Sequence, residues 1–149
     1  MKIIFLDIDG VLNNPKTWGL RPVHKAFSKE CVEAFNLIIE SVDADIVISS
    51  TWRNMFNFDD LIEMLKGAGV AGHIIGKTPS IRFSGAERGD EIARWLDRAS
   101  EEAGFKITKF VILDDDSDMG YLFNYLVRCN PETGITEKEV KKAIEMLNE

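Results

Sequence analysis

The chain has 149 residues, which is enough for one domain with a hydrophobic core of its own. Its net charge of −7 disfavours nonspecific binding along duplex DNA, because that binding depends on neutralising many phosphates. No apolar run is long enough to span a membrane and no cationic leader precedes the first predicted strand, so we expect a cytoplasmic protein that folds as a single domain over residues 1–149.

The first predicted element is a short apolar strand over residues 2–6, which has the composition of a buried strand in a parallel sheet. Two carboxylates, Asp7 and Asp9, follow this strand directly, and Gly10 comes next. Because the desolvation of a charge is costly, carboxylates at the edge of a core need a compensating partner. The rest of the sequence has to show what this compensating partner is.

The rest of the chain alternates between helical and extended patterns, after a polar loop over residues 13–25. Ser28 and Thr136 stand at the starts of predicted helices as N-caps, and Asp116 is expected to cap a further helix that begins at Met119. Helices are predicted near residues 28–42, 58–67, 88–103 and 136–147, and strands near residues 44–49, 73–75, 110–113 and 125–129. This alternation predicts an α/β fold with a doubly wound, Rossmann-like, mostly parallel sheet and helices on both faces.

Three predicted strands end in polar residues, at the edge of a parallel sheet where ligands bind. These residues are Asp7 and Asp9 after the first strand, Ser49 and Ser50 after the second, and Asp114 and Asp115 after the fourth. Carboxylates from two strands in one small volume would repel one another and raise each other's pKa unless a cation joined them. Oxygen ligands of this kind suit Mg²⁺, so we expect a magnesium site at this edge.

The segments FLDIDGVL, VISST and VILDDDSD, with a basic residue between the last two, resemble the four motifs of the haloacid dehalogenase (HAD) superfamily of aspartate-nucleophile phosphatases. The motifs span nearly the whole chain, and the first is the most specific. Within the superfamily, SSTWR, GKTP and RGDEIARWL are similar to the small phosphatase domains of bacterial and phage nucleic-acid end-repair proteins. The resemblance implies a Mg²⁺-dependent phosphatase that works through an aspartyl-phosphate.

The resemblance also implies a role for each matching residue. Asp7 matches the nucleophile that attacks phosphorus, and Asp9 matches the general acid and base. Ser49 matches the hydroxyl that hydrogen-bonds the transferring phosphoryl group, with Ser50 as the alternative. Asp115 matches the metal-binding acid of the last motif, so the expected metal ligands are Asp7, Asp9, Asp115 and Asp114.

Three candidates for the phosphate-binding cation, Lys77, Arg82 and Arg88, lie between the second and fourth motifs. We favour Arg88, because it opens a predicted helix and a guanidinium binds phosphate through paired hydrogen bonds. Lys77 is the second choice. Arg53, just past the second strand, is either a further phosphate contact or an ordinary solvated residue, and the sequence favours neither.

Related phosphatases insert a cap domain at one of two places in the chain. The corresponding segments here are the loop that ends at Lys25 and residues 76–87, and both are too short to build a cap domain. We therefore expect an open site, which suits a phosphate on a large molecule such as a nucleic-acid end or a phosphoprotein. Trp18 lies in the first loop among the cations Lys16, Arg21, His24 and Lys25. Its ring is expected either to stack on a terminal base or to fold back on the core.

Other activities remain open from the sequence alone. The loop that contains Trp18 could close over a small nucleotide, so a small-molecule or nucleotide phosphatase of the same fold is an alternative. A receiver-type signalling domain is also acidic and doubly wound, but it carries its acidic pair after the first strand, whereas here that pair follows the fourth. The sequence leaves the physiological substrate and the oligomeric state undecided.

Overall fold

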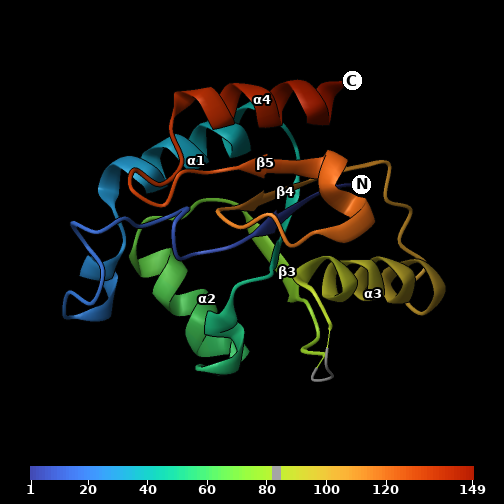
Figure 1. Cartoon of the computed structure of the whole chain (residues 1–149), viewed down its shortest axis with the longest axis horizontal. Helices are drawn as coiled ribbons and strands as arrows, with labels where there is room; N and C mark the ends of the chain where they lie inside the picture. Colours follow the sequence, from blue (N-terminus) through green and yellow to red (C-terminus); the bar gives the residue numbers. More distant parts are fainter. Residues whose placement is uncertain (82–84) are drawn as a thin grey trace.

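The structure, a computed structural model, describes residues 1–81 and 85–149. Its centre is a five-stranded sheet in the order β3-β2-β1-β4-β5, in which every neighbouring pair is parallel (Figure 1). The strands are β1 (Lys2–Leu6), β2 (Asp45–Ile48), β3 (His73–Lys77), β4 (Lys109–Asp114) and β5 (Leu126–Arg128). The α-helices are α1 (Lys29–Ser41), α2 (Phe58–Gly67), α3 (Arg88–Glu101) and α4 (Glu137–Asn148). Short 3₁₀ segments are η1 (Val23–Ala26), η2 (Thr51–Asn54) and η3 (Gly120–Tyr125).

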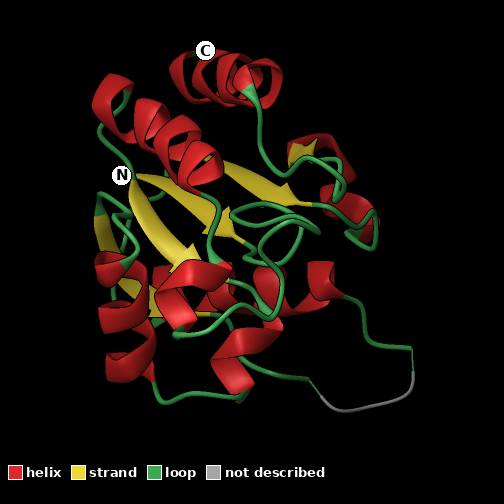
Figure 2. Ribbon diagram, turned by 90° about the vertical axis from the view of Figure 1, so that its left-hand side faces the viewer, coloured by secondary structure: helices red, strands yellow, loops and turns green. Residues whose placement is uncertain are grey.

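Helices cover both faces of the sheet, and the strands run between them in one direction (Figure 2). Side chains of β1 alternate between the two faces. Ile4 and Leu6 belong to a core shared with α1, α2 and α4, whereas Ile3 and Phe5 belong to a second core with α3 and η3. On that second face the rings of Phe5 and Trp95 meet edge to face, with centroids 5.5 Å apart. The predicted doubly wound α/β fold is confirmed.

Two of the predicted helix caps are present. Ser28 Oγ accepts a hydrogen bond from Cys31 N at the start of α1, and Thr136 forms a capping box with Glu139 at the start of α4. Both caps satisfy backbone N–H groups that have no partner inside the helix. Each helix begins where its cap predicts. The apolar residues of both helices belong to the core on one face of the sheet.

The predicted cap at Asp116 is wrong. The segment after β4 forms η3, whose N-cap is Met119 and has no side-chain cap bond, and Asp116 Oδ1 instead accepts from Ser117 N at 2.7 Å. The reason is close packing on α3. Gly89 N donates to Asp118 O at 3.1 Å, and a Cβ on Gly89 would overlap the carbonyl of Met119. The chain therefore runs along α3 in this segment before it enters β5.

The described residues form no cap domain over the carboxyl edge of the sheet. β1 is joined to α1 by a loop and η1, and β3 is joined to α3 by residues 78–87, of which residues 82–84 lie outside the described part. In the described parts of the chain, no helix is both long and apolar enough to cross a membrane. Because the described residues form no cap domain, the edge of the sheet that carries the polar residues is open.

Candidate active site

The carboxyl ends of β1 and β4 bring three aspartates together. β1 pairs with β4 so that Leu6 lies opposite Leu113, and Asp7 N donates to Leu113 O at 3.0 Å. One carboxylate oxygen from each of Asp7, Asp114 and Asp115 lies within 4.8 Å of the other two. The predicted meeting of carboxylates from two strands is thus observed, and the group is called the aspartate cluster below.

Gly10 is required for this close approach. Its φ of +80° is in the left-handed region, which glycine adopts without the steric cost of a side chain. A Cβ at this position would also overlap the carboxylate of Asp115. The turn after Asp9 therefore depends on glycine both for its conformation and for the space that Asp115 occupies.

The aspartate cluster carries more buried negative charge than its protein partners compensate. Burial is the main reason that the pKa of Asp7 is raised to about 6, against the opposing effect of Arg88. Burial, followed by the charge of Asp7, raises the pKa of Asp114 to about 8. A bound cation would relieve both effects, and carboxylate oxygens are the ligands that Mg²⁺ prefers. The side chains of Asp7, Asp114 and Asp115 therefore fit a magnesium site.

Arg88, the first residue of α3, supplies a cation to the aspartate cluster. Its Nη1 lies 3.2 Å from Asp7 Oδ1 and 3.1 Å from Asp114 Oδ2. Burial alone would lower the pKa of Arg88, but the charges of Asp7 and Asp114 raise it, so the guanidinium stays charged. The backbone N of Arg88 faces Asp118 Oδ2 at 3.4 Å, which fixes the start of α3 against the loop after β4. The position of Arg88 is the one expected for a phosphate-binding residue.

Of the other two cations considered from the sequence, only Lys77 can be placed relative to the aspartate cluster. Lys77 is exposed at the end of β3, an edge strand separated from β1 by β2, and no described contact joins it to Asp7 or Asp114. Arg82 lies outside the described residues. Among the described residues, Arg88 is therefore the better supported candidate.

Arg53 is a buried residue with structural contacts, which do not support a phosphate contact, one of the two alternatives that the sequence leaves open. Its Nη1 donates to the carbonyl oxygens of Ser49 and Ser50 at 3.1 and 2.8 Å, and its Nε donates to Thr78 O at 3.0 Å. Its Nη2 forms an ion pair with Glu91 Oε1 at 2.8 Å. Because every nitrogen of the side chain has a protein partner and Arg53 is only 5% exposed, it ties the end of β2 to α3 and is not available to substrate.

The two serines after β2 have different surroundings, although both are fully buried. Ser50 Oγ accepts from Trp52 N at 3.2 Å and caps η2, so the structure gives this hydroxyl a local role in place of the predicted substrate contact. Ser49 Oγ has no hydrogen-bond partner among the described residues. A buried hydroxyl without a partner is costly, which makes Ser49 the better candidate for contact with a phosphoryl group.

Asp9 lies apart from the aspartate cluster. Its Oδ1 accepts from Asn13 Nδ2 at 2.9 Å and its Oδ2 accepts from Trp52 Nε1 at 3.1 Å. The chain turns at Gly10, so the carboxylate of Asp9 does not follow that of Asp7 as it would in a continuous strand. This geometry does not support Asp9 as a side-chain metal ligand. It does suit a carboxyl group that exchanges protons, because both oxygens are held in place at an exposed position.

Sequence reasoning misses Asn13 and Trp52 as members of this site. Asn13 is only 1% exposed, and besides its bond to Asp9 its Oδ1 accepts from Gly10 N at 2.8 Å and from Trp18 Nε1 at 2.7 Å. The available sequence signal is weak: an asparagine four residues after Asp9, in a turn that begins at a glycine. Asn13 is important because the folded loop brings it into contact with Asp9, Gly10 and Trp18 at once.

A cavity of about 470 Å³ opens beside Asp9. Trp18, Trp52 and Asp115 contribute to its lining, and Trp18 is 46% exposed there. None of the cations expected near Trp18 lines this cavity, and Lys16 lines a different one over α1. The cavity therefore offers aromatic surface next to a carboxylate, with no lysine or arginine in its lining among the described residues.

Comparison with known proteins gives one informative match. A family model described as "HAD domain in Swiss Army Knife RNA repair proteins" matches residues 3–140, which is nearly the whole chain. The match confirms the resemblance seen in the motifs around Asp7, Ser49 and Asp115. No curated protein and no solved structure matches the chain significantly.

Proposed function

Because this chain belongs to the family of HAD domains in Swiss Army Knife RNA repair proteins, we propose that it is a Mg²⁺-dependent phosphomonoester hydrolase that removes a phosphate from the end of a polynucleotide. The observation that carries the proposal is the ion pair between Arg88 and Asp7, which places a guanidinium beside a buried carboxylate at the first motif. Phosphoryl transfer needs a nucleophile, charge neutralisation and a proton donor, and this site holds a candidate for each.

In the first step, a carboxylate oxygen of Asp7 attacks phosphorus and the bond from phosphorus to the ester oxygen breaks, which gives an aspartyl-phosphate. Arg88 exchanges part of its pairing with Asp7 for the phosphoryl oxygens, while Asp114 continues to hold the guanidinium in place. The free hydroxyl of Ser49 donates to another phosphoryl oxygen, which supports the step because that hydroxyl has no described protein partner.

Asp9 supplies the proton for the leaving oxygen and in the second step takes a proton from the water that hydrolyses the aspartyl-phosphate. Asn13 and Trp52 hold one carboxylate oxygen each, so Asp9 presents a fixed position to the leaving group. A magnesium ion held by Asp7, Asp114 and Asp115 would supply charge neutralisation for the incoming phosphate. The products are inorganic phosphate and the free hydroxyl end.

The substrate class follows from the open edge of the sheet and from the family. The described residues build no cap domain, so a phosphate at the end of a long chain can reach Asp7 without enclosure. The family model is named for RNA repair proteins, and this supports an RNA end. A free nucleotide is the second candidate, because the cavity beside Asp9, lined in part by Trp18 and Trp52, offers a nonpolar surface for one base.

The test is release of inorganic phosphate from single-stranded oligoribonucleotides that carry a phosphate at the 3′ end or at the 5′ end. We expect release by the wild-type protein with Mg²⁺ and none after chelation or in Asp7→Asn. Asp116→Asn is the matched control, because this carboxylate lies outside the aspartate cluster and, among the described residues, accepts a hydrogen bond from Ser117 N alone. Equal release by Asp7→Asn and wild type would overturn the proposal, and release from mononucleotides alone would favour the second candidate.

A further inference from the structure

A groove lies along the outer edge of the sheet, beside β5. It has a volume of about 370 Å³, and its lining includes Phe123, Asn124, Arg128, Lys138 and Lys142. β5 is an edge strand, so the groove lies between the end of η3, the strand and the start of α4. We refer to it as the β5 groove.

Arg128 connects the β5 groove to the candidate active site. Its Nε donates to the carbonyl oxygen of Asp115 at 3.1 Å, and Asp115 belongs to the aspartate cluster. The residue is exposed, and its two terminal nitrogens have no partner among the described residues. A guanidinium with free donors therefore lines the groove and is hydrogen-bonded to the backbone of the aspartate cluster.

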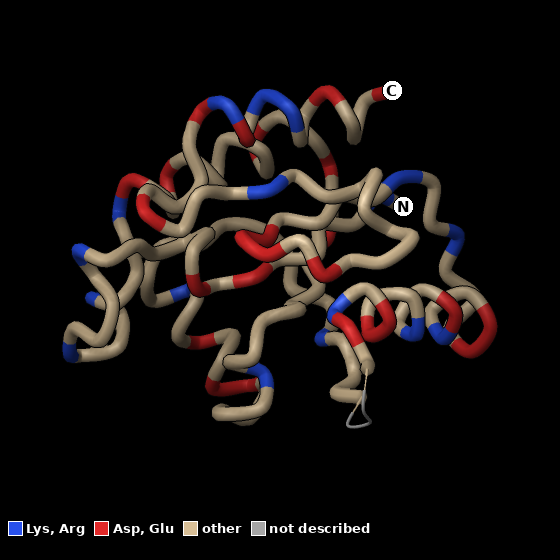
Figure 3. Tube along the Cα trace, in the orientation of Figure 1, with Lys and Arg blue, Asp and Glu red and all other residues tan. Residues whose placement is uncertain are grey.

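The positions of Lys138 and Lys142 in α4 include two interactions that destabilise the helix. Lys138 and Lys142 are four residues apart, so they lie on the same side of α4 and repel each other. Lys138 also lies in the first turn, where the helix dipole disfavours a cation. Figure 3 shows the basic segments of α4 above the basic segment of β5. An anion bound in the groove would reverse both unfavourable effects.

Glu139 also lines the β5 groove, but its carboxylate is already used. Its Oε1 accepts from the backbone N and from the hydroxyl of Thr136 in the capping box, and the residue is 9% exposed. The exposed charges of the groove are accordingly positive, in a chain whose net charge is −7. A positively charged groove on a negatively charged protein points to an anionic partner.

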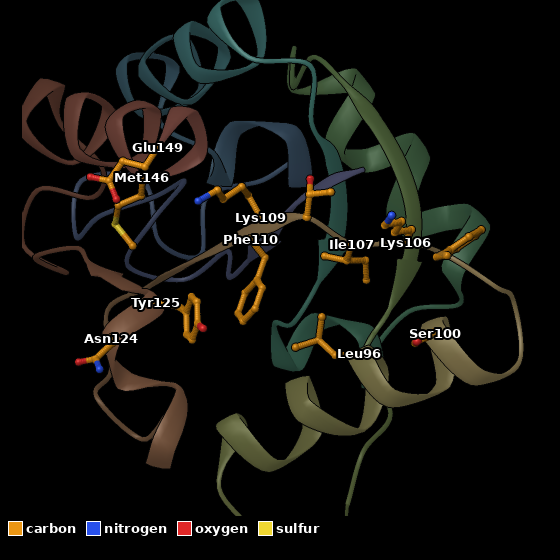
Figure 4. A pocket seen from close by; sticks show the side chains of 12 residues that line it. Leu96, Ser100, Lys106, Ile107, Lys109, Phe110, Asn124, Tyr125, Met146 and Glu149 are labelled. Carbon is orange, nitrogen blue, oxygen red and sulfur yellow. The ribbon is translucent and has the colours of Figure 1, made fainter.

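Aromatic side chains accompany these cations. Phe123, at the far end of the β5 groove from Arg128, is 56% exposed. Asn124 lines both this groove and a second cavity of about 640 Å³, in which Phe110 and Tyr125 stack with centroids 4.1 Å apart (Figure 4). Lys109 lines the second cavity as well. Cations close to exposed aromatic rings such as Phe123 are typical of surfaces that bind single-stranded nucleic acid.

From this arrangement we infer that the β5 groove binds the backbone of a single-stranded polynucleotide whose phosphorylated end lies in the active site. The inference rests on the proposed function for the identity of the end, but the groove itself makes a separate prediction about binding. Arg128, Lys138 and Lys142 contact backbone phosphates, and Phe123 stacks on a base. The bound polynucleotide leaves the active site along β5 and runs toward the cavity at Tyr125.

The test measures binding of a fluorescent oligoribonucleotide that lacks a terminal phosphate, so that no turnover can occur. We expect the double variant Lys138→Gln, Lys142→Gln to weaken binding about tenfold at low salt. The slope of log Kd against log salt should fall by about 1.4, because each phosphate neutralised on a single strand contributes about 0.7. Phe123→Ala should weaken binding about fivefold or more, through the lost stacking on a base.

Two matched controls separate the groove from general surface effects. Lys141→Gln removes one positive charge from the same helix, against two in the double variant, and Lys141 lines a different cavity, with Leu37 and Ile144. Tyr121→Ala removes a ring that is 77% exposed and does not line the groove. Both controls should keep the affinity and the salt slope of the wild type. Equal losses in controls and groove variants, or no loss in either, would overturn the inference.

A comparison of substrates distinguishes this inference from the proposed function. The double variant should lose kcat/KM on an end-phosphorylated oligoribonucleotide while it keeps the wild-type rate on an aryl phosphate. Groove-dependent binding without any hydrolysis would contradict the proposed function and support the groove. Hydrolysis with unchanged oligoribonucleotide binding in the double variant would contradict the groove.

Two other roles for these cations predict different results. If they only shield the edge of the sheet from pairing, the double variant self-associates and binds oligoribonucleotide as the wild type does. If the partner is an acidic protein segment, a polyglutamate peptide competes as well as the oligoribonucleotide. Either result would overturn the assignment to nucleic acid.

Discussion

The side-chain amide of Asn13 donates a hydrogen bond of 2.9 Å to Asp9 Oδ1. Asn13 is nearly inaccessible to solvent, and the other side of its amide accepts from Gly10 N and Trp18 Nε1. Trp52 holds the second oxygen of Asp9. The proposed general acid is therefore held on both sides, by Asn13, which lies outside every segment quoted for the HAD resemblance, and by Trp52, which belongs to the SSTWR segment.

Asn13→Ala should impair the reaction according to the leaving group. A carboxyl group that is no longer held in place protonates a poor leaving group less well, so we expect kcat on an alkyl phosphate to fall about tenfold or more. An aryl phosphate with an acidic phenol needs little protonation and should lose much less. Asn14→Ala is the control, because Asn14 bonds to Thr133 and Lys16 but not to Asp9. Equal losses on both substrates would show that Asn13 supports only the fold of the loop.

Asp7→Asn and Asp9→Asn should fail at different steps. Without the Asp7 carboxylate no aspartyl-phosphate forms, so turnover should be abolished. Asp9→Asn should still allow slow phosphorylation of Asp7 by an activated aryl phosphate. Beryllium fluoride or aluminium fluoride, soaked into crystals, should be found on the carboxylate of Asp7. Density joined to Asp9 would reverse the two assignments.

The parts of this molecule that local sequence determines are predicted well. The apolar run before Asp7 predicts β1, Ser28 predicts the start of α1, and the capping box at Thr136 predicts the start of α4. The meeting of Asp7 with Asp114 and Asp115 follows from the alternation of strands and helices, because carboxyl ends of parallel strands share one edge. Each of these predictions needs only local patterns and the topology.

The side chains that the sequence leaves undecided or places wrongly are those whose role depends on the packing of the folded chain. Nothing near Arg53 indicates that its guanidinium will pair with Glu91 and hydrogen-bond to Thr78 O. Asp116 has the composition of a cap, but the chain after β4 packs on α3 instead of beginning a capped helix. Asp9 lies apart from the other expected metal ligands for a similar reason, since its carboxylate is hydrogen-bonded to Asn13 and Trp52.

Glu91→Ala should destabilise the protein substantially. The side chains of Arg53 and Glu91 are only 3% and 13% exposed, and their nitrogen and oxygen atoms lie 2.8 Å apart. Removal of Glu91 leaves a buried charge without its partner, which typically costs about 3–5 kcal/mol. Urea unfolding measures the change. Glu33→Ala, which breaks the exposed pair with Lys29, should have little effect, and a similar loss in both variants would contradict the role given to Arg53.

The last prediction concerns the pH dependence of stability and its response to Mg²⁺. The pKa of Asp7 is raised to about 6 and that of Asp114 to about 8, from an ordinary value of 3.8. Between these values the folded protein binds more protons than the unfolded chain, so without a cation the free energy of unfolding should fall as the pH rises from about 4 to about 8. Asp114→Asn removes one of the two groups and should flatten this decline.

Mg²⁺ should act in the opposite direction, because it binds the ionised carboxylates that protons would otherwise neutralise. The increase in Tm caused by Mg²⁺ should therefore be larger at pH 8 than at pH 5, and it should shrink in Asp114→Asn. Asp116→Asn should behave as the wild type, since Asp116 stands outside the aspartate cluster. A Tm increase of the same size at both pH values would show that Mg²⁺ binds elsewhere. Such a result would remove the metal role from Asp114 while leaving the predictions for Asp9 and Asn13 unchanged, because these depend on proton transfer alone.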